Sequence, residues 1–212
     1  MNDKISNADA RRLFLYLHGL SDLKDRKYED HHLPHMINKI GFVQIDSIKT
    51  VERAHHHILF SRLKSYERTW LKKHLEDEGT LFENWTHDAS IIPMAFFPYW
   101  RPRFKRAEEK INKSKWWRKR IGNDPDAICS EVLNYIETNG PARARDIKLP
   151  NDILTREFES ETWWGWNPSK AALVFLWRTG QLAVKGRENF QKVYDLTKNV
   201  IPKNILELEP TL

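Results

Sequence analysis

The chain has 212 residues, of which 40% are hydrophobic and nine are tryptophan, so it holds enough apolar material for packed cores. This length fits one or two domains, and we expect two units of roughly 100 residues each. No apolar run approaches the ~20 residues of a membrane span, and the first residues, MNDKISNADARR, lack the apolar core of a signal peptide. We therefore expect a cytoplasmic protein without membrane contact. The single cysteine, Cys129, excludes an internal disulfide and a cysteine-based zinc cluster.

The positive charge of the chain is concentrated in one segment. The formal net charge is +6, yet residues 101–120 alone include ten basic and two acidic side chains. The rest of the chain carries 25 basic and 27 acidic residues, which nearly cancel. A basic stripe of this kind is a candidate track for nucleic-acid phosphates, although a solvated helix face has the same composition. Trp116 and Trp117 lie inside the stripe, and both interpretations stay open at this point.

The first hundred residues predict helices followed by short strands. Ser6 or Asn7 can cap a first helix with one apolar face, and a polar loop follows at residues 20–30. Pro34 suits the first turn of a second helix, which Gly41 terminates.

The chain then reads as extended over residues 42–48, whereas residues 51–63 fit either a strand or a helix. Another short helix is predicted over residues 66–75, and another extended segment over residues 81–86. This order of helices and strands indicates a winged-helix unit over residues 1–100.

Prolines mark the middle of the chain. Pro93, Pro98 and Pro102 predict a turn-rich connection, after which the basic stretch can run as one helix from Phe104 to about Ile121. The sequence Gly-Asn-Asp-Pro at 122–125 ends that helix and opens the next one, with Asp124 as its N-cap and Pro125 in its first turn.

The second half predicts three helices and a hairpin. The first helix ends at Asn139 and Gly140, a second short helix covers residues 141–147, and Ser169 caps a third that ends at Gly180. The following residues alternate around a turn at Gly186, as a hairpin does. This is the order of a winged helix, whose third helix commonly enters the DNA major groove.

The predicted class is therefore mainly α with short β hairpins, an α+β fold made of tandem winged-helix units. The first unit covers residues 1–100 and holds the candidate catalytic motif, and the second covers residues 124–202. A basic helix at 101–123 connects them, and residues 203–212 begin a linker.

The candidate catalytic motif is Gln44-Ile45-Asp46. On an extended chain Val43 and Ile45 can be buried while Gln44 and Asp46 project together from the opposite face. An amide and a carboxylate side by side can hold a water molecule against a substrate. A strand edge with one solvated face would show the same alternation.

Nine histidines raise the question of a metal site, because they include clusters at residues 31–35 and 55–57. Three adjacent side chains on one segment point in different directions and cannot all reach one ion. We therefore expect no metal.

Several segments resemble one enzyme family: GFVQIDSI at 41–48, VERAHHHILFSRL at 51–63, ENWTHDASIIP at 83–93 and the run 170–202. The family is the YcaQ-like winged-helix DNA glycosylases of the crosslink-unhooking type. Its members carry Gln-x-Gln or Gln-x-Asp at the catalytic centre, and this chain has the second form. Full-length members are longer, so the resemblance implies that a third winged helix and a C-terminal β-rich domain are absent here.

The resemblance implies hydrolysis of the N-glycosidic bond of alkylated purines in double-stranded DNA, including N7-alkylguanine and crosslinked bases. It implies no metal and no organic cofactor, and we expect a monomer. Asp46 would stabilise the oxocarbenium-like sugar and supply the water, Gln44 would bind that water or the substrate, and His87 would orient the site or contact a phosphate. The expected DNA contacts are Arg53, His55, His56, Arg101, Arg103, Lys105, Arg106, Lys115, Arg118, Lys119 and Arg120.

An alternative from another class is a winged-helix DNA-binding protein without catalysis, such as a transcription regulator. Composition, basic stripe and hairpin fit it equally well. A regulator would bind one undamaged sequence far better than others, whereas a glycosylase would release a base from alkylated DNA with little sequence preference.

Overall fold

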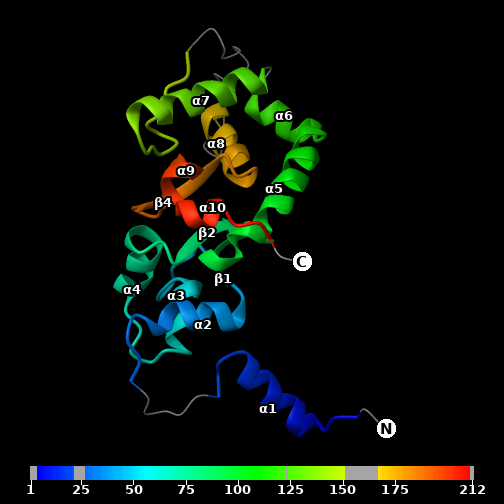
Figure 1. Ribbon diagram of the computed structural model, residues 1–212, viewed down its shortest axis with the longest axis vertical. Coiled ribbons are helices and arrows are strands. Elements are labelled where there is room, and N and C mark those ends of the chain that lie inside the picture. Colours follow the sequence, from blue (N-terminus) through cyan, green and yellow to red (C-terminus); the bar gives the residue numbers. More distant parts are fainter. Residues whose placement is uncertain (1–3, 22–26, 123, 151–166, 211–212) are drawn as a thin grey trace. The chain divides into compact units, whose positions relative to one another are not determined.

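The computed structural model describes residues 4–21, 27–122, 124–150 and 167–210, and divides the chain into two compact units (Figure 1). Unit 1 spans Met1–Met94 and unit 2 spans Ala95–Leu212. Each unit combines helices with a small antiparallel sheet, so the predicted α+β class is confirmed. No helix in the described part of the chain is both long and apolar enough to cross a bilayer.

Unit 1 contains helices, one π-helical turn and three strands. In chain order these are α1 (Asn7–Leu17), α2 (His32–Ile40), β1 (Val43–Gln44), α3 (Ala54–Phe60), α4 (Arg68–Lys72), the π-turn η1 (Lys73–Asp77), β2 (Leu81–Trp85) and β3 (Ala89–Pro93). The strand order is β1-β3-β2, and both pairings are antiparallel. The segment that fitted either period is helical, because α3 lies within it.

The core of unit 1 lies between α2 and the sheet. Leu33 and Ile37 of α2 are fully buried, as is Ile92 of β3. The predicted end of α2 is confirmed, since Gly41 follows it with φ of 88°, a conformation that glycine adopts without strain. The packing of these apolar residues fixes the start of β1 two residues later.

Helix α1 forms as predicted but does not bury its apolar face. The Ser6 hydroxyl accepts a hydrogen bond from the Asp9 N–H at 3.1 Å, which satisfies one of the free N–H groups at the start of the helix. None of the residues of α1 is buried, and Phe14 is 57% exposed. The Arg62 guanidinium donates to the carbonyl of His18 at 2.8 Å, which connects the end of α1 to the segment after α3.

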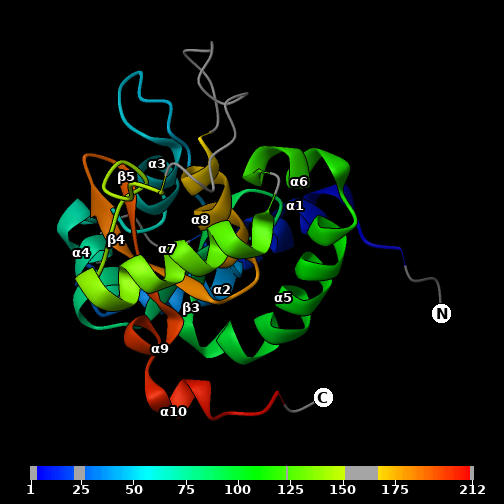
Figure 2. The ribbon, with the colours of Figure 1, turned by 90° about the horizontal axis from the view of Figure 1, so that it is seen from above.

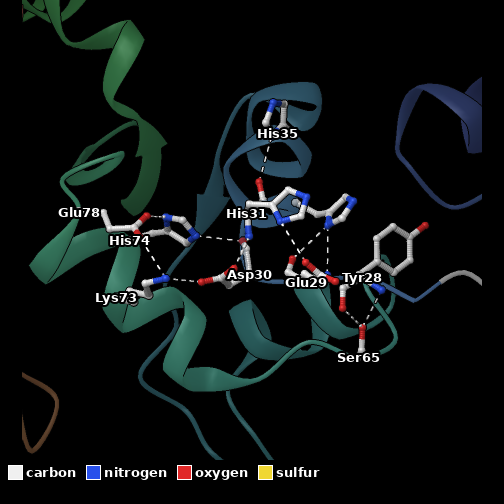
Figure 3. A network of polar contacts seen from close by, with 10 residues as sticks. Tyr28, Glu29, Asp30, His31, His35, Ser65, Lys73, His74 and Glu78 are labelled. Carbon is white, nitrogen blue, oxygen red and sulfur yellow. Dashed lines mark hydrogen bonds and ion pairs between the residues drawn. The ribbon is translucent and has the colours of Figure 1, made fainter.

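A polar network joins the start of α2 to η1 (Figure 3). The Lys73 ammonium pairs with Asp30 and with Glu78, and its hydrogen bond holds the pKa of the Asp30 carboxyl below its usual value. The buried ring of His74 donates from Nε2 to the Asp30 carbonyl at 2.9 Å. Since Asp30 lies just before α2, these bonds anchor the helix at its beginning.

Unit 2 contains helices and one hairpin, and the short 3₁₀ turn η2 (Met94–Phe96) lies at the unit boundary. Its elements are α5 (Phe97–Asn112), α6 (Lys115–Ile121), α7 (Pro125–Asn139), α8 (Pro168–Arg178), β4 (Leu182–Glu188), β5 (Gln191–Leu196), α9 (Thr197–Val200) and α10 (Lys203–Leu206). Strands β4 and β5 are antiparallel, and Ala142 adds a bridge to Tyr194 through two main-chain hydrogen bonds of 2.9 Å. Through this bridge the segment around Ala142, which precedes α8 in the chain, pairs with β5 of the hairpin.

Two helix starts in unit 2 depend on side-chain caps. Asp124 caps α7 as predicted, since its Oδ1 accepts from the Ala127 N–H at 3.0 Å. The predicted cap of α8 is wrong: Asn167 accepts from the Lys170 N–H at 3.2 Å, whereas Ser169 lies inside the helix and is buried. The sequence Asn-Pro-Ser places the cap immediately before a proline in the first turn, which is a favourable helix start.

The predicted turn-rich connection is wrong, because Pro98 and Pro102 both lie in α5. Pro98 occupies the first turn, where the missing N–H has no helical partner in any case. Pro102 removes one hydrogen bond a turn later, and the helix continues through it to Asn112. The single basic helix is wrong as well, since Ser114 takes an extended conformation and its hydroxyl caps α6.

The segment at residues 141–147 and the turn of the hairpin both differ from the prediction. Residues 141–147 form a turn instead of a helix, and Asp146 holds that turn by accepting from the Arg143 guanidinium at 2.7 Å. The hairpin reverses at Asn189 and Phe190, whose φ angles are 47° and 69°, whereas Gly186 lies at a bulge in β4. Consecutive positive φ angles match the twist of a two-residue hairpin, and asparagine tolerates them well.

Helix α8 is the centre of unit 2. It packs against α5, α6 and α7, and eight of its eleven residues are buried. Figure 1 shows it beneath α7, and within the helix Lys170 is the exposed side chain. Lys170, Val174 and Arg178, spaced four residues apart, form the narrow part of the helix that is not buried. The expectation that this third helix enters the DNA major groove stays a prediction.

The last described residues pack within unit 2. Residues 203–212 are predicted to begin a linker, whereas in the described part of this segment α10 packs on α5. The Arg101 guanidinium donates to the Leu206 carbonyl and pairs with Glu209 at 3.0 Å.

A substitution at Gly180 can test the contact between the end of α8 and Phe104 of α5. A Cβ built there would lie 2.4 Å from Phe104 Cδ2, and the φ of 80° is unfavourable for alanine. Gly180→Ala should lower the free energy of unfolding by about 2–3 kcal/mol, because strain and overpacking add. Gly140→Ala is the matched control, since its φ of 83° is similar and nothing lies within 4 Å of the new Cβ. Urea unfolding measures both, and an equal loss in the two variants would contradict the close packing of Phe104.

Candidate active site

The Gln-Ile-Asp motif lies on β1 and the residues directly after it. Gln44 pairs with Ser90 of β3, and the Ile45 N–H donates to the Ala89 carbonyl at 2.8 Å, so the extended conformation continues past the strand. Val43 and Ile45 are buried, whereas Gln44 and Asp46 are half-exposed. The predicted alternation of buried and accessible side chains is therefore present.

The side chain of Gln44 is held by the turn between β2 and β3. Its Nε2 donates to Asp88 Oδ2 at 3.3 Å, and its Oε1 lies 3.0 Å from His87 Nε2. An amide oxygen can only accept, so His87 is the donor in the second bond. Both bonds connect residues more than forty positions apart and orient the amide in one direction.

His87 thus belongs to the same cluster as Gln44. It is exposed, and its ring stands edge-on to Phe42 with centroids 5.9 Å apart. The turn beneath it is held by the Thr86 hydroxyl, which lies 2.9 Å from the hydroxyl of the fully buried Ser90. The turn that carries His87 is accordingly tied to the strand that pairs with β1.

Asp46 has a different environment from Gln44. Its Oδ1 accepts a hydrogen bond from the Ile48 N–H at 2.8 Å, which is the bond of a local turn. Within the described part of the chain its other oxygen, Oδ2, takes no hydrogen bond. One carboxylate oxygen is thus fixed by the backbone while the second can bind water or substrate.

Asp88 is the site residue that the sequence analysis missed. Its Oδ1 accepts from the Ala89 N–H at 2.8 Å, and its Oδ2 accepts from Gln44. The available signal was its position next to His87, two residues before the strand position opposite Gln44. Only the pairing of β1 with β3, which joins distant parts of the chain, shows that this position lies beside Gln44.

The DNA contacts predicted just after the motif differ in how far their side chains are buried. His55 is only 5% exposed and faces inward, so its side chain is not available to a partner in this arrangement. His56 is half-buried, its Nδ1 lies 2.8 Å from the Tyr66 hydroxyl, and burial lowers its pKa. Arg53 is half-buried at the start of α3. Among the three, His56 and Arg53 keep surface that a partner can reach.

Some basic side chains of α5 and α6 are engaged within unit 2, and the others are exposed. Arg101 is engaged with residues 206 and 209, as described above, and Arg120 stacks on the Trp116 ring at 3.5 Å. The other predicted contacts are exposed: Arg103, Lys105, Arg106, Lys115, Arg118 and Lys119. Most of the stripe is therefore accessible surface.

The cluster consists of hydrogen-bonding and acid–base groups. In the described residues no set of three or more histidine, cysteine, aspartate or glutamate side chains is placed to hold a metal ion. Two carboxylates, an amide and an imidazole on one small surface are groups that bind and activate water for hydrolysis.

A comparison with known families places this candidate site in an enzyme family. Residues 37–211 match the family described as DNA glycosylase AlkZ-like, which covers most of the chain. The chain therefore belongs to the AlkZ-like DNA glycosylases, enzymes that release bases from DNA in repair. No solved structure matches it. The matched range includes the Gln-Ile-Asp motif, the β2–β3 turn and both basic helices, whereas α1 lies outside it.

The bond between Gln44 and His87 can be tested by a double-mutant cycle. We expect Gln44→Ala and His87→Ala to be non-additive in single-turnover base excision, with a coupling of about 0.5–3 kcal/mol, because they share a hydrogen bond. A cycle of Gln44→Ala with the exposed His57→Ala is the control and should be additive. Additive losses for Gln44 and His87 would show that this bond does not contribute to the reaction.

Proposed function

We propose that the chain hydrolyses the N-glycosidic bond of N7-alkylated purines in double-stranded DNA, including bases in interstrand crosslinks. The observation that carries this proposal is the pairing of an oriented amide, Gln44, with a carboxylate, Asp46, that keeps one oxygen available. Membership of a DNA glycosylase family supports the reaction class.

In the proposed reaction Asp46 acts on both the sugar and the water. Its negative charge stabilises the positive charge that develops on the deoxyribose as the bond from C1′ to N9 breaks. Its Oδ2 then accepts a proton from the water whose oxygen bonds to C1′. The products are a free 7-alkylpurine, which leaves as a neutral base, and an abasic sugar.

Gln44 positions the water in this scheme. The amide nitrogen carries two hydrogens, and the bond to Asp88 uses one of them. The second hydrogen can bind the water oxygen, while His87 and Asp88 prevent the amide from rotating. His87 and Asp88 therefore act as positioning residues.

Substrate chemistry explains why so few groups suffice. Alkylation at N7 makes the purine cationic, so the base departs without being protonated by the enzyme. One carboxylate and one amide then provide what remains: charge stabilisation and an oriented water. The proposed reaction uses no metal and no organic cofactor.

We further propose that both units are winged helices. Unit 1 has the order α2-β1-α3-α4-β2-β3, and its first strand pairs with its last. In unit 2 the Ala142 bridge pairs with β5, the last strand of that unit, after α7 and before α8. A helix, a short strand that joins the final hairpin, and a hairpin after the last helix are features of winged-helix topology.

The proposed mechanism predicts unequal effects of two substitutions. Asp46→Asn removes the charge and keeps an oxygen that can accept from the Ile48 N–H, so folding and DNA affinity should be retained. Single-turnover excision of N7-methylguanine should fall about 10²-fold or more, because a base and charge stabiliser is lost. Gln44→Ala should cost less, since a second water can replace the amide.

Circular dichroism and duplex affinity of the same protein samples are the controls for that comparison. Excision by Asp46→Asn at the parent rate would reject the assignment and make His87 the next candidate. Tight binding to one undamaged sequence, with no excision by the parent, would favour the regulator.

The basic stripe is proposed to bind the phosphates of DNA. Changing Lys115, Arg118 and Lys119 to Glu should weaken binding to every duplex alike and flatten the dependence of log K on log salt. Arg101→Glu is the contrasting variant, because Arg101 is already paired within unit 2 and should affect stability more than the salt slope. Fluorescence anisotropy at several salt concentrations measures both. An unchanged slope in the triple variant would remove the stripe from the interface.

A further inference from the structure

A loop with an apolar tip follows the catalytic motif directly. The 47–52 loop runs from Ser47 to Glu52, between the motif and α3, and Figure 2 shows the chain leaving the body of unit 1 there. Ile48 is 71% exposed and Val51 is 81% exposed, the highest values among the large hydrophobic side chains of the described residues. Two branched aliphatic side chains at the tip of one loop expose surface that is more stable when buried.

The base of this loop is held at both ends. Asp46 bonds to the Ile48 N–H on one side, and a bridge between Lys49 and Arg53 closes the part of the loop that carries Val51. On the other side Glu52 pairs with Arg68 of α4 at 2.8 Å. The apolar tip is thus presented by a short, fastened loop.

The position of the tip relative to the reacting sugar is limited by chain length. Ile48 is two residues from Asp46 and Val51 is five, and a fully extended chain spans at most about 3.6 Å per residue. The tip therefore lies within ~7 to 18 Å of the Asp46 backbone. Base pairs are stacked ~3.4 Å apart, so this distance corresponds to at most a few base pairs from a sugar bound at Asp46.

The charges around the tip favour a nucleic-acid partner. Lys49 is exposed between the two apolar residues, and the carboxylate of Glu52 is neutralised by Arg68. A cation beside an apolar tip suits a surface with phosphates outside and stacked bases inside. Proteins that kink DNA insert leucine, isoleucine or similar side chains between base steps in this manner.

We propose that Ile48 and Val51 enter the base stack beside the damaged nucleotide and unstack it. The placement beside that nucleotide rests on the proposed function of Asp46, whereas insertion itself does not require catalysis. A wedge of this kind opens the duplex without moving the base into a closed pocket, which suits a purine that carries a bulky adduct.

The test uses the full chain and a duplex with a tetrahydrofuran abasic-site analogue next to 2-aminopurine, whose fluorescence rises when it is unstacked. The parent protein should raise the fluorescence, and Asp46→Asn should raise it equally. Ile48→Ser with Val51→Ser should lose the rise and bind this duplex about tenfold more weakly, because the buried apolar contact is removed. Leu17→Ser is the matched control: this side chain of α1 is 54% exposed and should behave as the parent does.

A fluorescence rise that persists in the double variant would overturn the proposal, as would a parent that gives no rise. A shift from dimer to monomer in the double variant, measured by sedimentation without DNA, would assign the tip to self-association instead and also overturn it. If Asp46→Asn excises bases at the parent rate while the wedge behaves as expected, the catalytic assignment fails and the wedge stands.

Discussion

The pairing of β1 with β3 is the constraint on which the candidate site depends. It joins segments that are more than forty residues apart and places Gln44 opposite Ser90. Each main-chain hydrogen bond contributes only about 1 kcal/mol, but the register also decides which side chains share a face. A shift by one residue would bury Gln44 and Asp46 and expose Val43 and Ile45. The hydrophobic core of unit 1 therefore fixes the geometry of the candidate site residues, although none of them belongs to that core.

Local chemistry allowed several elements to be predicted from the sequence. Ser6 and Asp124 begin helices through hydrogen bonds to residues three positions on, and Gly41 ends a helix with its positive φ. The structure contains each of them as predicted. The errors arise where a tertiary contact overrides a local signal. Pro102 is a helix breaker by propensity, yet α5 continues through it because the helix packs along unit 2. Residues 141–147 have helical composition, but Ala142 is bridged to Tyr194, which lies 52 positions away in the chain.

In the candidate site, too, the local features could be predicted from the sequence and the tertiary contacts could not. The alternation of Val43, Gln44, Ile45 and Asp46 is a local pattern, and it correctly indicated which side chains are accessible. The partners of Gln44 could not be derived in this way, since His87 and Asp88 reach it only through the folded sheet. The burial of α8 could not be predicted either, because an amphipathic pattern indicates one buried face and does not reveal that α6 covers a second one.

The two sheets provide a comparison within one molecule. In unit 2 the short strand segment that joins the last strand centres on Ala142, which carries neither an amide nor a carboxylate. The corresponding position of unit 1 holds Gln44, opposite Ser90 of its last strand. Both units have in common a pairing between an early segment and the final strand. The described residues of unit 2 contain no counterpart of Gln44, Asp46 and the His-Asp turn, so a small sheet closed in this way forms there without these side chains.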